Sequence, residues 1–278
     1  MQKEVIILPN KKDLSLYKEY NLNTLLLPLE NYSIGYNCYF NIDEINELSL
    51  NNKVYVLINK FLHLKIDSFR NIYDKFNKNI KFIVEDIGLS DVIDKNRIIL
   101  YENHILSNYK AINFLNGLGY DNLVINNDLT ISEIDEILDK CKCNLFYFYI
   151  SKNMLMYSRR NLVTNYNKHF KLNSSENKYN LVEKVSKNIL EITDYEDGSV
   201  VRNHKIFCAS KYIDKLNMNL IIDFSDIDEV SEKIILENIS ESNLCDLIDS
   251  DYYFLENDIK YKVGDLKWNM SYCYLLGI

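Results

Sequence analysis

Two kinds of polar residue stand where this sequence could carry out chemistry: a pair of acids and a pair of arginines. Glu85 and Asp86 end the apolar run "IKFIVED" at 80–86, and Arg159 and Arg160 follow the aromatic run at 143–150. A carboxyl group whose pKa is raised by burial can act as a general base, with its neighbour as a hydrogen-bond partner. A guanidinium group donates paired hydrogen bonds to a carboxylate or phosphate. Together these groups predict a pocket for a small anionic or amide-bearing substrate.

The double arginine is prominent because arginine is rare in this chain. The arginines are Arg70, Arg97, Arg159, Arg160 and Arg202. An alternative interpretation of the pair is a buried arginine–acid contact that anchors an inserted segment to the rest of the fold. On either interpretation we expect one of the two adjacent arginines to point to solvent. Neighbouring residues on a strand face opposite sides, so at most one of Glu85 and Asp86 is expected to enter the site.

Further polar residues stand at the ends of other apolar runs: Asn10, Asn59, Glu102, Asn103 and Asn126. We expect catalysis to involve Glu85 and Asp86. We expect the substrate to be bound by Asn59, Asn103, Asn126, Arg159 and Arg160. Side-chain amides suit this role because each one both donates and accepts hydrogen bonds.

Apolar runs alternate with amphipathic stretches along the chain, as parallel strands joined by helices do. The eight candidate strands are 4–10, 23–29, 53–59, 80–86, 96–103, 121–127, 143–150 and 218–224. Asn41 with Glu44 and Thr130 with Glu133 have the spacing of capping boxes at helix starts. The order predicts an α/β fold, a TIM-like (β/α)8 barrel that is somewhat degenerate. An open doubly wound sheet is the alternative, but the first strand is not followed by the glycine-rich turn typical of it.

The alternation breaks between the last two predicted strands. Residues 151–217 contain the double arginine, a polar segment and two alternating runs around Asp197-Gly198, which predict an antiparallel β-hairpin. We therefore expect one barrel domain over 1–278, a hairpin-containing insertion at 151–217 and a C-terminal extension at 248–278. In such a barrel the carboxyl ends of the strands share one rim, which would gather the polar residues there.

Composition and charge exclude several classes of protein. The formal net charge is -8 and the sequence pI is about 5.2, which argues against a protein that coats nucleic-acid phosphates. No apolar run is long enough for a signal peptide or a membrane span, so we expect a soluble protein of the cytoplasm with no membrane partner. The six cysteines are scattered, and none of them forms a CxxC pair.

Other catalytic chemistries find little support. No HExxH or HxxxH pair occurs, which argues against a metallopeptidase. Ser158 lies in "MYSRR", not in the nucleophile turn of a serine hydrolase. Cys38 is the thiol best placed for a barrel mouth, although a small buried hydrophobe is the simpler interpretation. We expect no metal site and no cofactor.

Several sequence segments, in their order along the chain, resemble those of one known family. They are "EDIG" at 85–88, "LTISEIDEI" at 129–137, "FYFYISKNMLMYSRRNLVTNY" at 146–166, "YEDGSVVRNHKIFCA" at 195–209 and "IKYKVGDL" at 259–266. They are similar to the collagenase-like peptidases, which form family thirty-two of the U (unknown mechanism) class. The resemblance implies a barrel-like fold and a peptidase label.

Some members of that family act in hydroxylation of RNA or quinone precursors with an iron–sulfur cluster held by four cysteines. Their signature reads roughly Glu-x-Phe-x-His-Gly-Ala-x-Cys and continues to Tyr-Ser-Gly-x-Cys. Aligned on the shared Tyr157-Ser158, its Glu, His, Gly and two Cys positions are occupied by Phe146, Ile150, Ser151, Met154 and Asn161, and its Phe is retained as Phe148. Since these clusters require converging thiolates, we predict that this chain binds no cluster.

The resemblance therefore implies a peptidase of the collagenase-like family, acting without a cluster on a peptide or small anionic substrate. The alternative is a non-catalytic binding or scaffold subunit that partners a cluster-bearing relative in a hydroxylation or modification pathway. A barrel for phosphorylated metabolites is a third possibility, but no glycine-rich phosphate loop follows the last strands.

Overall fold

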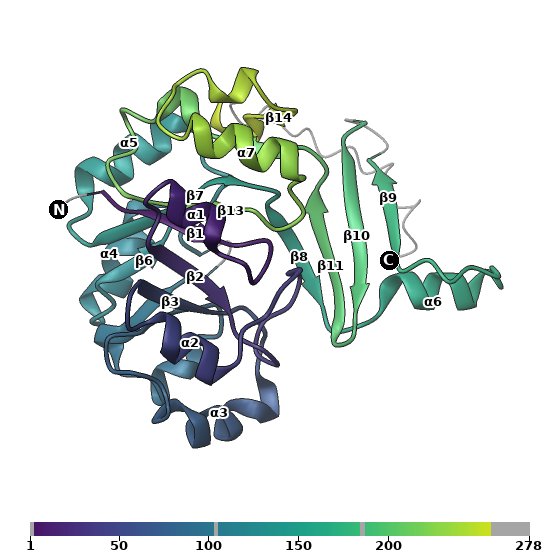
Figure 1. The fold of residues 1–278 in the computed structure, drawn as a ribbon, viewed down its shortest axis with the longest axis horizontal. Coiled ribbons are helices and arrows are strands. Elements are labelled where there is room, and N and C mark those ends of the chain that lie inside the picture. Colours follow the sequence, from purple (N-terminus) through teal and green to yellow (C-terminus); the bar gives the residue numbers. More distant parts are fainter. Residues whose placement is uncertain (1–2, 103–104, 184–186, 257–278) are drawn as a thin grey trace, which may run out of the picture.

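The computed structural model describes residues 3–102, 105–183 and 187–256, and its centre is a closed barrel of eight parallel strands (Figure 1). The barrel strands are β1 (Val5–Leu8), β2 (Thr24–Pro28), β3 (Lys53–Ile58), β4 (Lys81–Val84), β5 (Ile98–Leu100), β6 (Asn122–Val124), β7 (Asn144–Ser151) and β13 (Asn219–Asp223). They pair in chain order from β1 to β7, and β13 pairs with both β1 and β7, which closes the ring. The predicted (β/α)8 barrel is therefore confirmed.

Six α-helices of the barrel lie outside the ring of strands (Figure 1). They are α1 (Ser15–Glu19), α2 (Ile42–Leu48), α3 (Ile66–Tyr73), α4 (Tyr109–Gly117), α5 (Ile131–Lys140) and α7 (Glu229–Glu237). Both predicted capping boxes are present, at Asn41 with Glu44 and at Thr130 with Glu133. Between β4 and β5 the connection consists of two 3-10 turns, η2 (Ile87–Asp91) and η3 (Lys95–Arg97), so the barrel is degenerate at this point.

Apolar side chains fill the inside of the barrel. One buried cluster draws on all eight strands and contains Ile6, Leu8, Leu26, Tyr55, Leu57, Ile83, Ile99, Val124, Phe146, Phe148 and Ile221. The residues between them along each strand, such as Ile7 and Val56, pack outward in a second cluster with the helices. Because the interior is packed, a ligand can reach the barrel only at its ends.

A four-stranded antiparallel sheet stands beside the barrel, and its strands are β8 (Met154–Ser158), β9 (Lys178–Val182), β10 (Ile189–Tyr195) and β11 (Gly198–Asn203) (Figure 1). Its order is β8-β11-β10-β9, and β8 is the strand nearest the barrel in the view. Helix α6 (Leu162–His169) packs on this sheet through Val163, which contacts Ile192 and Val201. We call these four strands and α6 the appended sheet.

The predicted hairpin at Asp197-Gly198 is confirmed as the turn that joins β10 to β11. Gly198 has a φ of 144°, and a Cβ atom there would lie 2.0 Å from the carbonyl oxygen of Ser158. Glycine is therefore required at this turn, both by its backbone conformation and by the close approach of β8.

After the appended sheet the chain returns to the barrel. Strand β12 (Ile206–Cys208) pairs antiparallel with the end of β7 and parallel with β14 (Ser250–Asp251). Residues 259–266, which carry the last phrase of the family resemblance, lie outside the described residues. A search of the described helices for a segment that could cross the membrane found none.

Candidate functional site

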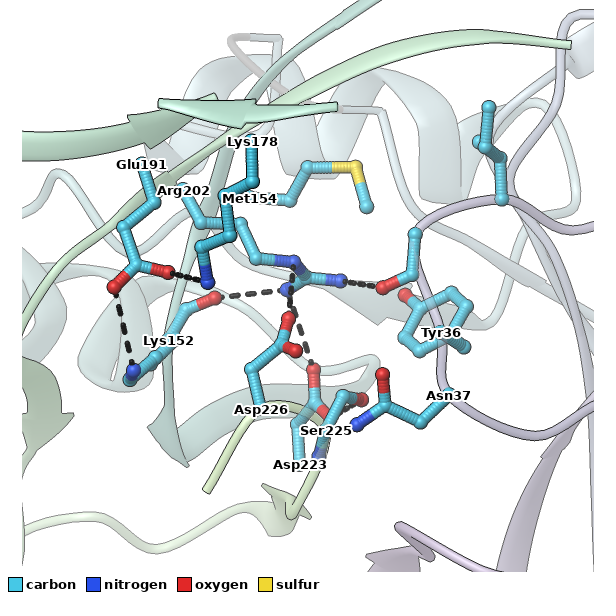
Figure 2. A network of polar contacts seen from close by, with 12 residues as sticks. Tyr36, Asn37, Lys152, Met154, Lys178, Glu191, Arg202, Asp223, Ser225 and Asp226 are labelled. Carbon is cyan, nitrogen blue, oxygen red and sulfur yellow. Dashed lines mark hydrogen bonds and ion pairs between the residues drawn. The ribbon is translucent and has the colours of Figure 1, made fainter. Parts of the chain in front are cut away.

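A buried arginine of the appended sheet lies at the carboxyl end of the barrel. Arg202 of β11 is 4% exposed; its Nη1 lies 3.7 Å from Asp223 Oδ2 and its Nε 3.6 Å from Asp226 Oδ2 (Figure 2). The guanidinium donates hydrogen bonds to the carbonyl oxygens of Lys152 and Gly35 at 2.8 and 2.6 Å. One cation thus joins the appended sheet, the β2–α2 loop and the end of β13.

The surrounding carboxylates keep this arginine charged. Burial alone would lower the pKa of Arg202, but the negative charges of Asp223 and Asp226 raise it, and the net direction is upward. Burial has the opposite effect on Asp223: it raises the pKa of this carboxyl group, and the positive charge of Arg202 opposes that shift. Ser225 donates to Asp223 Oδ1 from its backbone N–H at 2.8 Å and also from its hydroxyl. The Nε atom of Arg202 has no hydrogen-bond partner among the described residues, so its contact with Asp226 is an ion pair alone. The two ion pairs and the two carbonyl contacts together anchor the appended sheet to the barrel.

The two predicted arginines occupy different surroundings from this one. Arg159 and Arg160 are both exposed, in the turn between β8 and α6. The buried arginine–acid pair considered for them in the sequence is formed by Arg202 instead. Nothing local in the sequence marks Arg202, but Asp223 is the second-last residue of the last predicted strand, 218–224, as Glu85 is of 80–86. The strand-end rule that selected Glu85 would have selected Asp223 as well.

Glu85, the first residue after β4, faces an open cavity on the same rim. This cavity has a volume of about 210 Å³ and is lined by Glu85, Glu102, Phe61 and the β8 residues 154–157. The Glu85 side chain is buried, and no hydrogen bond or ion pair engages its carboxyl group within the described part of the chain. Burial, and secondly the charge of Glu102, raise the pKa of Glu85 to about 8. The carboxyl group therefore holds a proton at neutral pH.

Glu102, which follows β5, is the second acid of this cavity. Its pKa is also raised, first by burial, while the backbone N–H of Ile87 acts in the opposite direction. Two negatively charged carboxylates in one cavity repel each other. The state in which one of the two acids keeps its proton is therefore favoured over the state in which both are ionised. Two such acids can supply a proton donor and a proton acceptor to one substrate.

Asp86 does not line this cavity. Its Oδ1 accepts a hydrogen bond from the backbone N–H of Gly88 at 2.9 Å, and its Oδ2 accepts one from Leu62 at 3.0 Å. It therefore caps the turn η2 and ties that turn to the β3–α3 loop. As expected from the alternation of a strand, only one of the two neighbouring acids faces the cavity.

The predicted asparagines differ in whether their side-chain amides already have hydrogen-bond partners. Asn59 is buried, and its Oδ1 and Nδ2 are bonded to the backbone N–H and carbonyl of Ile34 at 2.9 and 3.0 Å, which fixes the β2–α2 loop. Asn126 is 7% exposed, and its Nδ2 has no hydrogen-bond partner among the described residues. It lines a second cavity of about 250 Å³ with Tyr101 and Asn153. Asn103 lies outside the described residues.

Arg159 lines a third and larger hollow, a cleft of about 440 Å³. We call it the cationic cleft, and its wall contains Lys60, Phe61, His63, Lys65, Tyr157, Arg159, Asn161, Glu196 and Asp197. Arg160 is not part of that wall. Lys60 is neutralised there, because its Nζ lies 2.5 Å from Asp197 Oδ2 and also donates to the carbonyl of Asn31. This ion pair holds the hairpin turn against the β3–α3 loop.

Strand β8 connects the three hollows. Met154 and Leu155 line both the Asn126 cavity and the Glu85 cavity. Phe61 and Tyr157 line both the Glu85 cavity and the cationic cleft. The acid Glu85 and the arginine Arg159 thus line neighbouring hollows along β8, and we call the three hollows together the β8 groove.

The described cysteines do not fit an iron–sulfur cluster. Cys38 is partly buried, which raises its pKa to about 11, and its Sγ contacts the carbonyl of Pro9 at 3.5 Å. Cys208 and Cys245 lie together behind β7, away from the β8 groove, and Cys245 Sγ contacts the carbonyl of Cys208 at 3.1 Å. No group of three or more potential metal ligands occurs among the described residues. Cys273 lies outside them.

At the signature positions, the structure has side chains without a thiolate. Met154 packs against the interior cluster of the barrel, and its sulfur lies 3.8 Å from Asn59 Nδ2. Asn161 donates from its amide to the carbonyl of Tyr195 at 2.9 Å. Both residues are therefore used in packing or in backbone contacts, and no step below involves a cluster.

Comparison with known proteins gives one family. The sequence profile of peptidase family U32 matches residues 12–224. Among solved structures, the chain is similar to the U32 peptidase Mk0906, with 12% identity, a TM-score of 0.43 and coverage of 55% of this chain and 70% of that one. It is also similar to a chitinase from Chromobacterium violaceum ATCC 12472, with 10% identity, a TM-score of 0.36 and coverage of 86% and 98%. None of the curated proteins compared with the chain matches it.

Proposed function

Because the chain belongs to peptidase family U32, we propose that it hydrolyses peptide bonds with Glu85 as the proton donor. The observation that carries this proposal is the state of the Glu85 carboxyl group. It is buried and has no partner among the described residues, it faces an open cavity, and its pKa is raised to about 8. A carboxylic acid that keeps its proton at neutral pH can give it to a leaving amine.

The neighbouring acid would complete the reaction. Glu102 is less enclosed than Glu85, so its carboxyl group ionises first and can accept a proton from a water molecule. The water oxygen would attack the carbonyl carbon of the peptide bond, and Glu85 would protonate the departing nitrogen. The C–N bond breaks, a carboxylic acid and an amine are released, and proton exchange with solvent restores both acids.

The substrate would lie in the β8 groove. Met154, Leu155 and Met156 give the Glu85 cavity an apolar wall. Asn126 lines the adjoining cavity, and its Nδ2 atom is buried without a partner among the described residues. An apolar wall with a few polar groups is the usual make-up of a site that binds an organic ligand. The packed interior of the barrel excludes the substrate from the other side.

The proposal is tested by incubating the purified chain with a library of fluorescence-quenched peptides. We expect cleavage by the unaltered protein and a loss in kcat of about a hundredfold or more in Glu85→Gln. Glutamine is a matched replacement because it keeps the size and the neutral charge of the protonated acid. The control is Glu237→Gln on the outer helix α7, which makes the same chemical change away from the cavity.

Two results would contradict this function. Cleavage that is unchanged in Glu85→Gln would remove Glu85 from the mechanism. A complete lack of cleavage, together with recovery of a cysteine-complete family relative in a pull-down from native extract, would favour a non-catalytic subunit instead.

A further inference from the structure

Strand β8 has an open edge along the groove. The appended sheet has the order β8-β11-β10-β9, so β8 pairs with β11 on one side and, within the described part of the chain, with no strand on the other. An edge strand offers backbone N–H and C=O groups at a regular spacing, and an extended peptide can pair with them as an additional strand. This edge adjoins all three hollows, so a peptide paired to β8 would pass directly over the Glu85 cavity.

The cationic cleft at one end of β8 contains positive charge without partners. Lys60 is already neutralised by Asp197, whereas Lys65 and Arg159 form no ion pair within the described residues. Glu196 adds one negative charge at the rim, and His63 adds an imidazole ring. In a chain with a formal net charge of -8, this is a local excess of cations.

The walls of the cleft suit a side chain of a peptide. The rings of Phe61 and Tyr157 are nearly parallel, with centroids 6.2 Å apart and 13° between their planes, and Phe61 is 52% exposed. Both rings also line the Glu85 cavity. A peptide could therefore run from the acids to the cations across one aromatic surface.

One residue of the cleft has an unusual backbone. His63 begins the turn η1 (His63–Lys65) with a φ of 46°, a conformation that side chains other than glycine adopt rarely. Backbone strain of this kind clusters at active sites, ligand clamps and switch regions. Here it orients the start of the turn that contains Lys65.

We infer that the cationic cleft is a subsite for an acidic side chain of the peptide substrate, with Arg159 as the residue that binds its carboxylate. The backbone of the same peptide pairs with the open edge of β8. This inference rests on the proposed function for the nature of the ligand, and it adds the sequence preference of that ligand. Arg159 is suited to the role because a guanidinium binds both carboxylate oxygens at once.

A polynucleotide is a poorer match than an acidic peptide. Affinity for nucleic acid grows with the number of phosphates that a basic surface neutralises. The cleft has only Lys65 and Arg159 as unpaired permanent cations, and Glu196 and Asp197 lie on its rim. One carboxylate fits this charge balance, whereas a row of phosphates does not.

The test measures binding separately from cleavage. The full-length chain with Glu85→Gln is titrated, at low salt, into fluorescein-labelled peptides of eight residues in which one Glu is moved along a neutral sequence. A matched set has Gln at each position. We expect at least one Glu peptide to bind about tenfold tighter than its Gln partner, as charge-assisted hydrogen bonds do. Arg159→Gln should reduce this preference to about twofold or less.

The matched control is Arg160→Gln, which removes the neighbouring arginine outside the cleft and should leave the preference intact. The inference is overturned if no peptide binds, if Glu and Gln peptides bind equally, or if Arg160→Gln rather than Arg159→Gln abolishes the preference. If the preference is present but the unaltered protein cleaves no peptide, the proposed hydrolysis fails and the acidic subsite stands.

The strand pairing has its own readout. Methylation of alternate backbone nitrogens in the preferred Glu peptide removes donors that would pair with β8, without changing its charge. We expect one alternation of methyl groups to weaken binding about tenfold and the other to have little effect, because only every second residue of a paired strand faces its neighbour. Equal binding of both methylated peptides would contradict pairing with β8.

Discussion

The carboxyl end of the barrel has two regions in which a buried ionisable group has opposite surroundings. At Arg202, two carboxylates and two backbone carbonyls surround one cation (Figure 2). At Glu85, a buried carboxyl group has no partner among the described residues and faces an open cavity. Burial raises the pKa of Tyr101, Glu85 raises it further and Arg202 lowers it, so both regions act on this one residue.

The difference between the two regions distinguishes a charged group that stabilises the fold from an acid that is available to a substrate. A charge that is fully paired holds two segments together and is not available to a ligand. A carboxyl group that is buried but unpaired keeps a proton, which a substrate can take. In this chain the first arrangement attaches the appended sheet, and the second lies in the groove that this attachment creates.

The largest expected effect is the loss of the Arg202 anchor. Arg202→Met keeps much of the apolar length of the side chain but leaves Asp223 and Asp226 without their cation. We expect the free energy of unfolding to fall by about 3–5 kcal/mol, measured by urea denaturation at neutral pH. A partial recovery is expected when Asp223→Asn is added, because the double variant no longer buries the unpaired charge of Asp223, although Asp226 still lacks its cation. A loss below about 1 kcal/mol in the single variant would show that the pair is not an anchor.

A smaller effect for each pH unit is expected from the proton on Glu85. The folded state raises the pKa of Glu85 from 4.5 to about 8, so folding favours the protonated acid. Its contribution to stability is fully present below pH 4.5 and is lost as the pH rises toward 8. In that window the free energy of unfolding, relative to Glu85→Gln, should fall by roughly 1.4 kcal/mol for each pH unit. Parallel stability curves for the two proteins from pH 5 to 8 would contradict the pKa shift.

The smallest effect is expected at the second ion pair between the appended sheet and the barrel. Lys60 is nearly buried, but the side chain of its partner Asp197 is 44% exposed, so water competes for the charge. Lys60→Met should reduce the free energy of unfolding by about 1 kcal/mol or less, measured by the same denaturation. A decrease in the free energy of unfolding of Lys60→Met as large as that of Arg202→Met would contradict the expected difference between a solvent-exposed and a buried ion pair.

The sequence predicts the barrel well because its signals are local. Each strand is a short apolar run, and the boxes at Asn41 and Thr130 mark helix starts within four residues. The turn at Asp197-Gly198 is equally local, since its geometry depends on one glycine. The Glu85 cavity follows from the same local reasoning, because the carboxyl ends of parallel strands gather at one rim.

The parts of the site that escape prediction depend on contacts between distant residues. Arg202 bonds to Gly35, which precedes it by 167 residues, and no spacing in the sequence connects them. Asn59 is predicted to bind substrate, but its amide is occupied by the backbone of Ile34. The conspicuous "SRR" directs attention to both arginines, whereas Arg159 lines the cationic cleft and Arg160 does not. Such assignments require the position of the appended sheet on the barrel, which local patterns do not give.

The central claim is that Glu85 keeps its proton at neutral pH in an open cavity. Its most direct test is a carbon-13 NMR titration of the glutamate carboxyl groups, with the Glu85 signal identified by its absence in Glu85→Gln. The account predicts an apparent pKa of about 8 for that signal. A signal that titrates near 4.5, as an ordinary glutamate does, would contradict it.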